Sequence, residues 1–313
     1  MLNITQSASA KREAFRQELA SGRLLQLPGA FSPLGARQIE QFGFDGVYIS
    51  GAVLAAELGL PDIGLTTLTE VTQRGYQINR ATNLPTLIDV DTGFGEPMNM
   101  ARTIFELENL GLSGCHLEDQ VNPKRCGHLD GKQLVNTQTM VRRVRAAVDT
   151  RRDSNFLIMA RTDARASEGL ESAINRAKAY LDAGADAIFP EALADEREFE
   201  AFRKAIDAPL LANMTEFGKS RLMSREELAN LGVNLVIYPV SALRSAMGAS
   251  HRLLQTIRKE GSQLSVVDQM QTRAELYELL DYADYNRLDQ SLFNFRVADS
   301  AQPEQDRSGG REG

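Results

Sequence analysis

Two aspartates at the end of an apolar run are well placed to bind a metal ion. Asp89 and Asp91 stand two residues apart, so on a β-strand their side chains point the same way and can share one cation. Oxygen ligands with room for water suit Mg²⁺ better than zinc. Glu118, on a strand expected beside this one, strengthens that interpretation, whereas the alternative is an aspartate pair that begins the turn before Gly93.

A cysteine in a basic segment is the second candidate for chemistry. Lys124, Arg125 and His128 surround Cys126, and these neighbours should favour its thiolate form, the condition for a reactive cysteine. Gly127 would let the segment fold over a ligand. The alternative is a surface cysteine in a basic loop.

Eight short β-rich runs alternate with helical patterns, which is typical of parallel βαβ units. Glycine at the end of a helix, two or three turn residues and then a strand recur at residues 43–50, 111–118, 184–191 and 232–239. Eight such units favour an α/β fold of the closed (β/α)₈ barrel type. The predicted strands are residues 24–27, 46–50, 86–91, 114–118, 156–161, 187–191, 210–213 and 235–238, and helices include 98–109, 137–150, 170–183, 224–231 and 242–259.

Polar residues stand at or just beyond the ends of these strands, where the apolar runs stop. Any single one could merely terminate its strand, but six successive examples make chance a weak explanation. In a barrel the carboxyl ends of the strands meet at one rim, where active sites of this fold lie. The residues concerned are Ser50, Asp89 and Asp91, Glu118, Arg161 and Asp163, Glu191 and Asn213.

Length and composition fit one domain over residues 1–300, with extra helices after residue 259 and a disordered tail at 301–313. The chain has 42% hydrophobic residues but no run long enough to span a membrane. Two cysteines fit a reducing compartment, so we expect a cytoplasmic protein. The net charge of −7 argues against nucleic acid as a partner. An anionic substrate would need local cations.

The segment Lys124-Arg-Cys-Gly-His128 resembles the signature of the isocitrate lyase/phosphoenolpyruvate mutase superfamily, in its lyase branch. The similarity covers residues 10–295 in order, and it is stronger to short-chain 2-methylisocitrate lyases than to isocitrate lyases, which usually carry large insertions. Further stretches agree: Ser50-Gly-Ala, Leu58-Gly-Leu-Pro-Asp62, Asp89-Val-Asp-Thr-Gly-Phe-Gly95, His116-Leu-Glu-Asp-Gln120, Met159-Ala-Arg-Thr-Asp163, Phe189-Pro-Glu191, Ala212-Asn-Met-Thr-Glu-Phe-Gly218 and Gln271-Thr-Arg-Ala-Glu-Leu-Tyr277.

The resemblance implies an Mg²⁺-dependent carbon–carbon lyase that cleaves 2-methylisocitrate to pyruvate and succinate, in the methylcitrate cycle of propionate catabolism. Asp89 and Asp91 would hold Mg²⁺, with Glu118 in its outer shell. Cys126 would act as the general acid, Lys124, His128 and Arg161 would assist, and Tyr48 is the candidate for relaying a proton. The predicted substrate contacts are Ser50, Gly51, Ala52, Cys126, Gly127, Arg161, Glu191, Asn213, Met214, Thr215, Arg244 and Arg273. Ala52 stands where the family often has glycine.

Several alternatives stay open. The chain could be an isocitrate lyase or another member acting on a related hydroxy or keto carboxylate, and a barrel that binds carboxylates without turnover is a further alternative. The resemblance places the niche for the substrate's methyl group at Phe189 and Ile237, although both also fit the barrel core. His116, inside a strand, is expected to be a core residue. The family also suggests a homotetramer that exchanges a C-terminal helix between neighbours.

Overall fold

The expected alternation of strands and helices is present in the computed structural model, which describes residues 2–127 and 131–294. Each observed strand overlaps one predicted run, and no boundary differs by more than two residues. The strands are β1 (Leu25–Pro28), β2 (Val47–Ile49), β3 (Thr86–Asp89), β4 (Gly114–Glu118), β5 (Leu157–Thr162), β6 (Ala187–Pro190), β7 (Leu211–Asn213) and β8 (Leu235–Tyr238).

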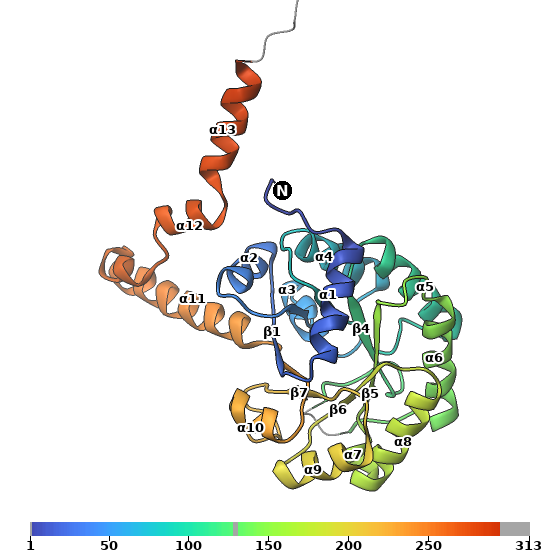
Figure 1. Cartoon of the computed structure of the whole chain (residues 1–313). Helices are drawn as coiled ribbons and strands as arrows, with labels where there is room; N and C mark the ends of the chain where they lie inside the picture. The colour runs from blue at the N-terminus through green and yellow to red at the C-terminus, as the bar shows by residue number, and fades with distance from the viewer. Residues whose placement is uncertain (1, 128–130, 295–313) are drawn as a thin grey trace, which may run out of the picture. The chain divides into compact units, whose positions relative to one another are not determined.

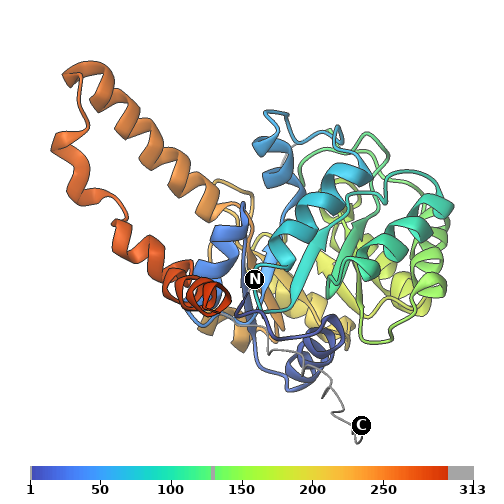
Figure 2. The ribbon, with the colours of Figure 1, turned by 90° about the horizontal axis from the view of Figure 1, so that it is seen from above.

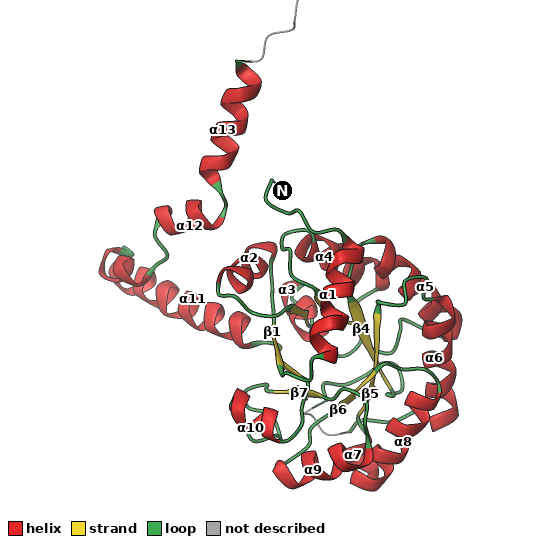
Figure 3. Ribbon diagram, in the orientation of Figure 1, coloured by secondary structure: helices red, strands yellow, loops and turns green. Residues whose placement is uncertain are grey.

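The strands close into a barrel. Strands β2 to β6 pair in sequence order, β8 lies between β1 and β7, and every pairing is parallel. Two single bridges, Gly29 with Tyr48 and Ile188 with Leu210, join the two groups of strands. The predicted (β/α)₈ barrel is therefore confirmed, and Figure 3 shows the strands at the centre with helices outside.

Most helices of the barrel unit follow a strand and pack on the outer face of the barrel (Figures 1 and 2). Several begin at a side-chain cap; Thr67, for example, forms a capping box with Glu70. The helices of the barrel unit, residues 3–270, are α1 (Ala8–Ala20), α2 (Pro33–Gln41), α3 (Gly51–Glu57), α4 (Leu68–Asn79), α5 (Pro97–Asn109), α6 (Thr137–Thr150), α7 (Ala164–Glu168), α8 (Leu170–Asp182), α9 (Glu196–Ala205), α10 (Arg225–Asn230), α11 (Ser241–Glu260) and the 3₁₀ helix η1 (Leu264–Gln269).

Two apolar cores lie on the two faces of the sheet. The larger one fills the space between strands and outer helices. The smaller one lies inside the barrel and contains alternate strand residues such as Leu87, Leu157 and Leu235. Both faces of the strands are therefore apolar. Because successive strand residues point to opposite faces, each strand appears in the sequence as a continuous apolar run.

Helix α1 closes the end of the barrel at which the strands begin. Phe15 and Leu19 pack into the inner core, and two buried cations anchor the helix to the turns before β3 and β4. Lys11 Nζ donates to the carbonyl oxygen of Thr82 at 2.6 Å, and Arg12 Nε donates to that of Leu112 at 2.8 Å. The opposite end, where the strands finish, carries the candidate site.

A second unit begins at Gln271 and contains α12 (Arg273–Leu279) and α13 (Tyr282–Phe293). In the first unit, α11 has no buried residue along its 20 residues. Within the described residues no helix is long and apolar enough to cross a membrane. The predicted disordered tail at 301–313 lies outside the described residues.

Candidate active site

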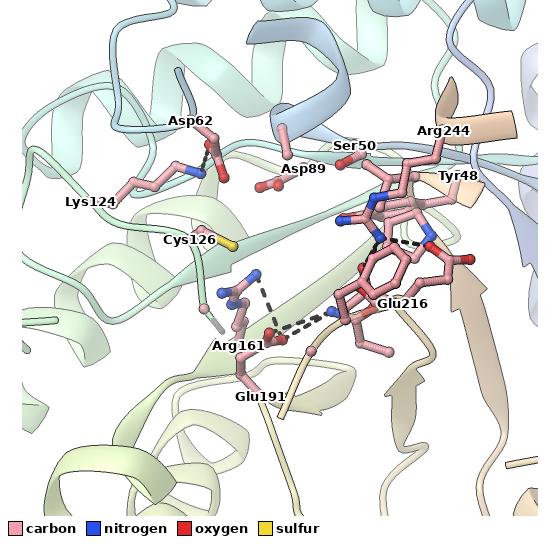
Figure 4. Close-up of a pocket in the computed structure, with 18 residues that line it drawn as sticks. Tyr48, Ser50, Asp62, Asp89, Lys124, Cys126, Arg161, Glu191, Glu216 and Arg244 are labelled. Carbon is pink, nitrogen blue, oxygen red and sulfur yellow. Dashed lines mark hydrogen bonds and ion pairs between the residues drawn. The ribbon is translucent and has the colours of Figure 1, made fainter. Parts of the chain in front are cut away.

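A cavity of about 210 Å³ opens at the carboxyl ends of the strands (Figure 4). Strand alternation brings polar residues there, because the positions that carry apolar side chains deeper in the barrel become polar two residues later: Leu87 precedes Asp89, and Met159 precedes Arg161. The cavity is lined by Tyr48, Ser50, Ala52, Asp62, Asp89, Lys124, Cys126, Gly127, Arg161, Glu191, Asn213, Thr215, Glu216, Phe217, Gly218, Pro239, Val240 and Arg244.

The two aspartates converge, but not as the sequence predicts. Strand β3 ends at Asp89, and Asp91 lies in the turn beyond it with a left-handed φ of 48°. Gly51 lies against both: a Cβ atom there would be 3.0 Å from Asp89 Oδ2 and 3.2 Å from Asp91 Oδ1. The Gly51 N–H also donates to Asp89 Oδ2 at 3.2 Å. A side chain at position 51 would therefore crowd this carboxylate pair.

The carboxylate pair fits a hard divalent cation. Burial raises the pKa of Asp91 to about 6; the Lys124 ammonium opposes the rise and the nearby Asp89 adds to it. A bound cation would offset the repulsion between the carboxylates of Asp89 and Asp91. Mg²⁺ commonly uses only one or two protein carboxylates and keeps several waters, so the pair suffices, although no group of three or more potential ligands occurs in the described part of the chain. Glu118 instead lies beside Arg161, with 3.2 Å between Glu118 Oε2 and Arg161 Nε.

Cys126 reaches the cavity from the segment after β4. The side chain of Gln120 holds this segment through the main-chain N–H and carbonyl of Arg125, each at 2.9 Å. Lys124 contacts two carboxylates. Its ammonium pairs with the carboxylate of Asp62 and lies 2.9 Å from Asp91 Oδ1. The activation of Cys126 by its neighbours stays a prediction, and His128 lies outside the described residues.

Arg161 is held among three buried carboxylates. Its Nε lies 2.9 Å from Asp163 Oδ2 and 3.2 Å from Glu118 Oε2, and Nη1 lies 3.8 Å from Glu191 Oε2. Gly127 packs directly on this group, since a Cβ there would be 2.3 Å from Arg161 Nη2 and 2.4 Å from Glu191 Oε1. The guanidinium is therefore fixed in place at the cavity wall.

Tyr48 forms its hydrogen bond below the cavity. Its hydroxyl lies 2.7 Å from His116 Nε2. Burial lowers the pKa of His116 to about 4, so the imidazole is neutral at pH 7. Burial also raises the pKa of Tyr48 well above its usual range. The neutral imidazole and the Tyr48 hydroxyl can exchange a proton across this contact. His116 is a fully buried residue of the barrel interior, as expected.

Arg244 marks the other wall of the cavity. Its Nη1 donates to Glu216 Oε2 at 2.7 Å, to the Glu216 carbonyl at 2.8 Å and to Thr215 Oγ1 at 3.3 Å. The Ser241 hydroxyl also donates to the Glu216 carboxylate. Glu216 thus ties the loop after β7 to the start of α11.

Three predicted substrate contacts, Gly51, Met214 and Arg273, are not among the residues that line the cavity. The Met214 side chain is buried in the outer core, where its sulfur accepts from Met223 N–H at 3.3 Å. Met214 follows Asn213, so its side chain points to the opposite face; a contact between Met214 and the substrate stays a prediction. Arg273 is the first residue of α12 in the second unit, and its role stays a prediction. Phe189 and Ile237, expected at the methyl niche, are buried in the inner core and do not line the cavity.

Loops supply the lining residues that sequence reasoning missed. They are Asp62, Glu216, Phe217, Gly218, Pro239 and Val240. Strand alternation does not extend into loops, so it gave no signal for them. The one signal in the sequence was adjacency to a predicted substrate contact: Glu216, for example, directly follows Thr215.

Comparison with known proteins agrees with this geometry. Residues 15–258 match the sequence model of the phosphoenolpyruvate phosphomutase family. A Corynebacterium glutamicum protein named "Probable 2-methylisocitrate lyase 1" is 61% identical over 291 residues, which are 93% of this chain and 95% of the relative. A Shewanella oneidensis 2-methylisocitrate lyase is 48% identical and covers 92% of this chain and 98% of its own.

Solved structures support the superfamily. The structure of 2,3-dimethylmalate lyase, described as a PEP mutase/isocitrate lyase superfamily member, is 32% identical, with a TM-score of 0.84 over 94% of this chain and 99% of its own. Phosphonopyruvate hydrolase in complex with oxalate and Mg²⁺ is 29% identical, with a TM-score of 0.81 over 91% of this chain and 99% of its own. The resemblance seen in the motifs is confirmed: the chain belongs to the phosphoenolpyruvate mutase/isocitrate lyase superfamily and, within it, to the 2-methylisocitrate lyases.

Proposed function

We propose that the chain is a carbon–carbon lyase that cleaves 2-methylisocitrate into pyruvate and succinate. One observation carries the proposal: a thiol, three cationic side chains and the Asp89 carboxylate share one cavity of about 210 Å³. Drug-sized ligands occupy pockets of about 300–1,000 Å³, so a smaller molecule suits this space. The activity named for relatives at 48–61% identity supports the same reaction.

The cationic and amide side chains would bind the substrate's carboxylates. Arg161 and Arg244 lie on two walls of the cavity, and guanidinium groups bind carboxylates through paired hydrogen bonds. Arg244 uses Nη1 for Glu216 and Thr215, which also line the cavity, and these contacts hold its guanidinium at the wall. Asn213 and Ser50 add uncharged polar atoms to the lining.

The reaction is a retro-aldol (Claisen-type) cleavage. The hydroxyl of the substrate loses its proton, its oxygen becomes the keto oxygen of pyruvate, and the bond between the fragments breaks. The electron pair of that bond remains on the succinate fragment, and Cys126 donates the proton that completes succinate. Tyr48 is the candidate for relaying the first proton: its hydroxyl would accept the proton of the substrate and pass its own proton to His116 Nε2.

We further propose Mg²⁺ as the cofactor, held by Asp89 and Asp91 directly or through water. Glu118 would act in the outer shell through its contact with Arg161. The chemistry that Mg²⁺ supplies in such sites is Lewis acid stabilisation of the oxygens of the forming keto acid. The related phosphonopyruvate hydrolase complexed with oxalate and Mg²⁺ supports this choice.

The methyl group of the substrate would contact apolar atoms in the loops rather than the inner core. Pro239 and Val240, after β8, and Phe217, after β7, line the cavity, whereas Phe189 lies below it in the core. One methyl group in an apolar pocket contributes only about 1–3 kcal/mol, or roughly a 10- to 200-fold preference over isocitrate.

A coupled assay tests the proposal with the purified chain in Mg²⁺. Pyruvate is measured with 2-methylisocitrate as substrate, and glyoxylate with isocitrate. We expect kcat/KM to favour 2-methylisocitrate. Equal or faster cleavage of isocitrate would refute the proposed substrate but not the proposed lyase activity. If neither compound is cleaved, the substrate and the activity are both refuted.

We also propose a homotetramer that acts in the cytoplasm. Apolar side chains of α11, Met247 and Leu254, are each more than 60% exposed, and in the second unit Phe293 of α13 is 87% exposed. Such surfaces are typical of contacts between subunits. Light scattering after size exclusion would give four times the chain mass of 34.5 kDa; a monomer would refute the tetramer.

A further inference from the structure

Lys132 is a charged residue that lies outside the cavity lining and has no role in the chemistry above. It stands between Cys126 and α6, and its side chain is 3% exposed. A buried ammonium is stable only where carbonyls or anions surround it. Its partners therefore indicate what it does.

The ammonium joins the cysteine segment to the end of β5. It donates to the main-chain carbonyl of Gly127, the residue after Cys126, and lies 2.9 Å from Asp163 Oδ1. Asp163 is itself fixed, because its N–H donates to Asp119 Oδ1 at 2.9 Å and its Oδ2 accepts from Arg161 Nε at 2.9 Å. Burial acts to raise the pKa of Asp163, but Arg161 and Lys132 hold it at about 2, so Asp163 is charged at neutral pH.

Gly127 is thus held from two directions. Its α-carbon packs against Arg161 and Glu191 so closely that a Cβ atom would be 2.3 Å and 2.4 Å from them. Its carbonyl accepts from Lys132. Because Gly127 is bonded to Cys126, contacts that fix the main chain of Gly127 also restrict the main chain of Cys126.

We propose that Lys132 is a positioning residue that sets the place of the Cys126 thiol by anchoring the Gly127 carbonyl to Asp163. It also supplies Asp163 with a second cation, so that Arg161 does not alone balance this buried carboxylate. The test has two measurements: turnover, which rests on the proposed lyase function, and alkylation of the Cys126 thiol, which does not.

The first variant is Lys132→Met, which keeps the length of the side chain and removes the ammonium. We expect kcat to fall about 10- to 100-fold with KM within about threefold, since a displacement on the order of 1 Å costs about this much in rate. Lys132→Arg, which keeps the charge and the donors, should recover part of kcat. Should the Met variant not fold, Lys132→Gln, which retains one donor for the carbonyl, is measured in its place.

The second readout is the alkylation rate of Cys126 by iodoacetamide at fixed pH without substrate, followed by peptide mass spectrometry. Displacement of the segment should change this rate at least about threefold in Lys132→Met. Cys115, which is fully buried, serves as the internal reference.

Lys11→Met is the matched control, because Lys11 is also buried and donates to main-chain carbonyls, those of Asn79 and Thr82, at the other end of the barrel. Its kcat and Cys126 alkylation should match the unmodified enzyme. The proposal is overturned if Lys132→Met keeps both rates, or if Lys11→Met lowers them equally. If the unmodified enzyme cleaves neither substrate, the proposed function fails, but the alkylation rates still decide the role of Lys132.

Discussion

A single methyl group added at Gly127 tests whether the cysteine segment needs its observed path. In Gly127→Ala the new carbon would lie 2.3 Å from Arg161 Nη2 and 2.4 Å from Glu191 Oε1, whereas real Cβ contacts are essentially never under 3.0 Å. Something must therefore move by about 0.7 Å or more. Overpacking of this kind typically costs about 1–3 kcal/mol in stability.

The segment, and not the arginine, is expected to yield. Arg161 is restrained by Asp163 at 2.9 Å and Glu118 at 3.2 Å, and all three side chains are buried. Movement of the main chain at Gly127 carries Cys126 with it. A misplacement on the order of 1 Å costs roughly 100-fold in rate, so we expect kcat to fall about that much while KM rises less.

Steady-state release of pyruvate measures the effect, and thermal unfolding shows whether the variant is folded. Gly22→Ala is the control: Gly22 has a left-handed φ of 78°, and no atom lies within 4 Å of the position that an added methyl group would take. Alanine there strains the backbone by about 1–2 kcal/mol without touching the site. We expect Gly22→Ala to lower the melting temperature but to keep kcat. If Gly127→Ala retains more than about a third of kcat, the reasoning on rate is refuted.

Three further predictions use the same preparations. Cys126→Ser should fold and bind substrate but lose at least about 100-fold in kcat, the usual scale for a positioned acid; turnover near that of the unmodified enzyme would remove Cys126 from the mechanism. EDTA should abolish activity and Mg²⁺ restore it, with Asp89→Asn needing at least about tenfold more Mg²⁺; full activity in metal-free buffer would contradict the metal role. Burial lowers the pKa of Lys11 from 10.5 to about 8, so between pH 8 and 10.5 the unfolded chain holds more protons and stability from this group rises with pH, by up to about 1.4 kcal/mol per pH unit. Urea unfolding should show this slope in the unmodified protein and its loss in Lys11→Met; equal slopes would contradict it.

The barrel could be predicted from sequence because its signals are local. Strands covered on both faces are continuously apolar, and several are preceded by a glycine turn, so all eight were located. Strand β3 shows the limit. It was extended to Asp91, but the chain turns after Asp89 with a left-handed φ at Asp91, a conformation that asparagine and aspartate adopt more readily than most residues.

The site could be predicted where strands position it and not where loops do. Asp89, Arg161 and Glu191 follow from strand alternation. Asp62 and Lys132 do not, because each lies on a loop and meets a partner far along the chain: Asp62 meets Lys124 across 62 residues, and Lys132 meets Asp163 across 31. Sequence spacing carries no information on such contacts.

The charges around the cavity indicate what the proposed Mg²⁺ would add to the binding of an anionic substrate. Among the described residues that line it, Lys124, Arg161 and Arg244 face four carboxylates: Asp62, Asp89, Glu191 and Glu216. Each cation already pairs with at least one carboxylate. A tricarboxylate would therefore enter a lining of net charge −1 in a chain of net charge −7. With Asp91 counted as the second ligand, the two charges of Mg²⁺ would cancel the net negative charge of that lining, so the metal is expected to support substrate binding as well as the chemical step.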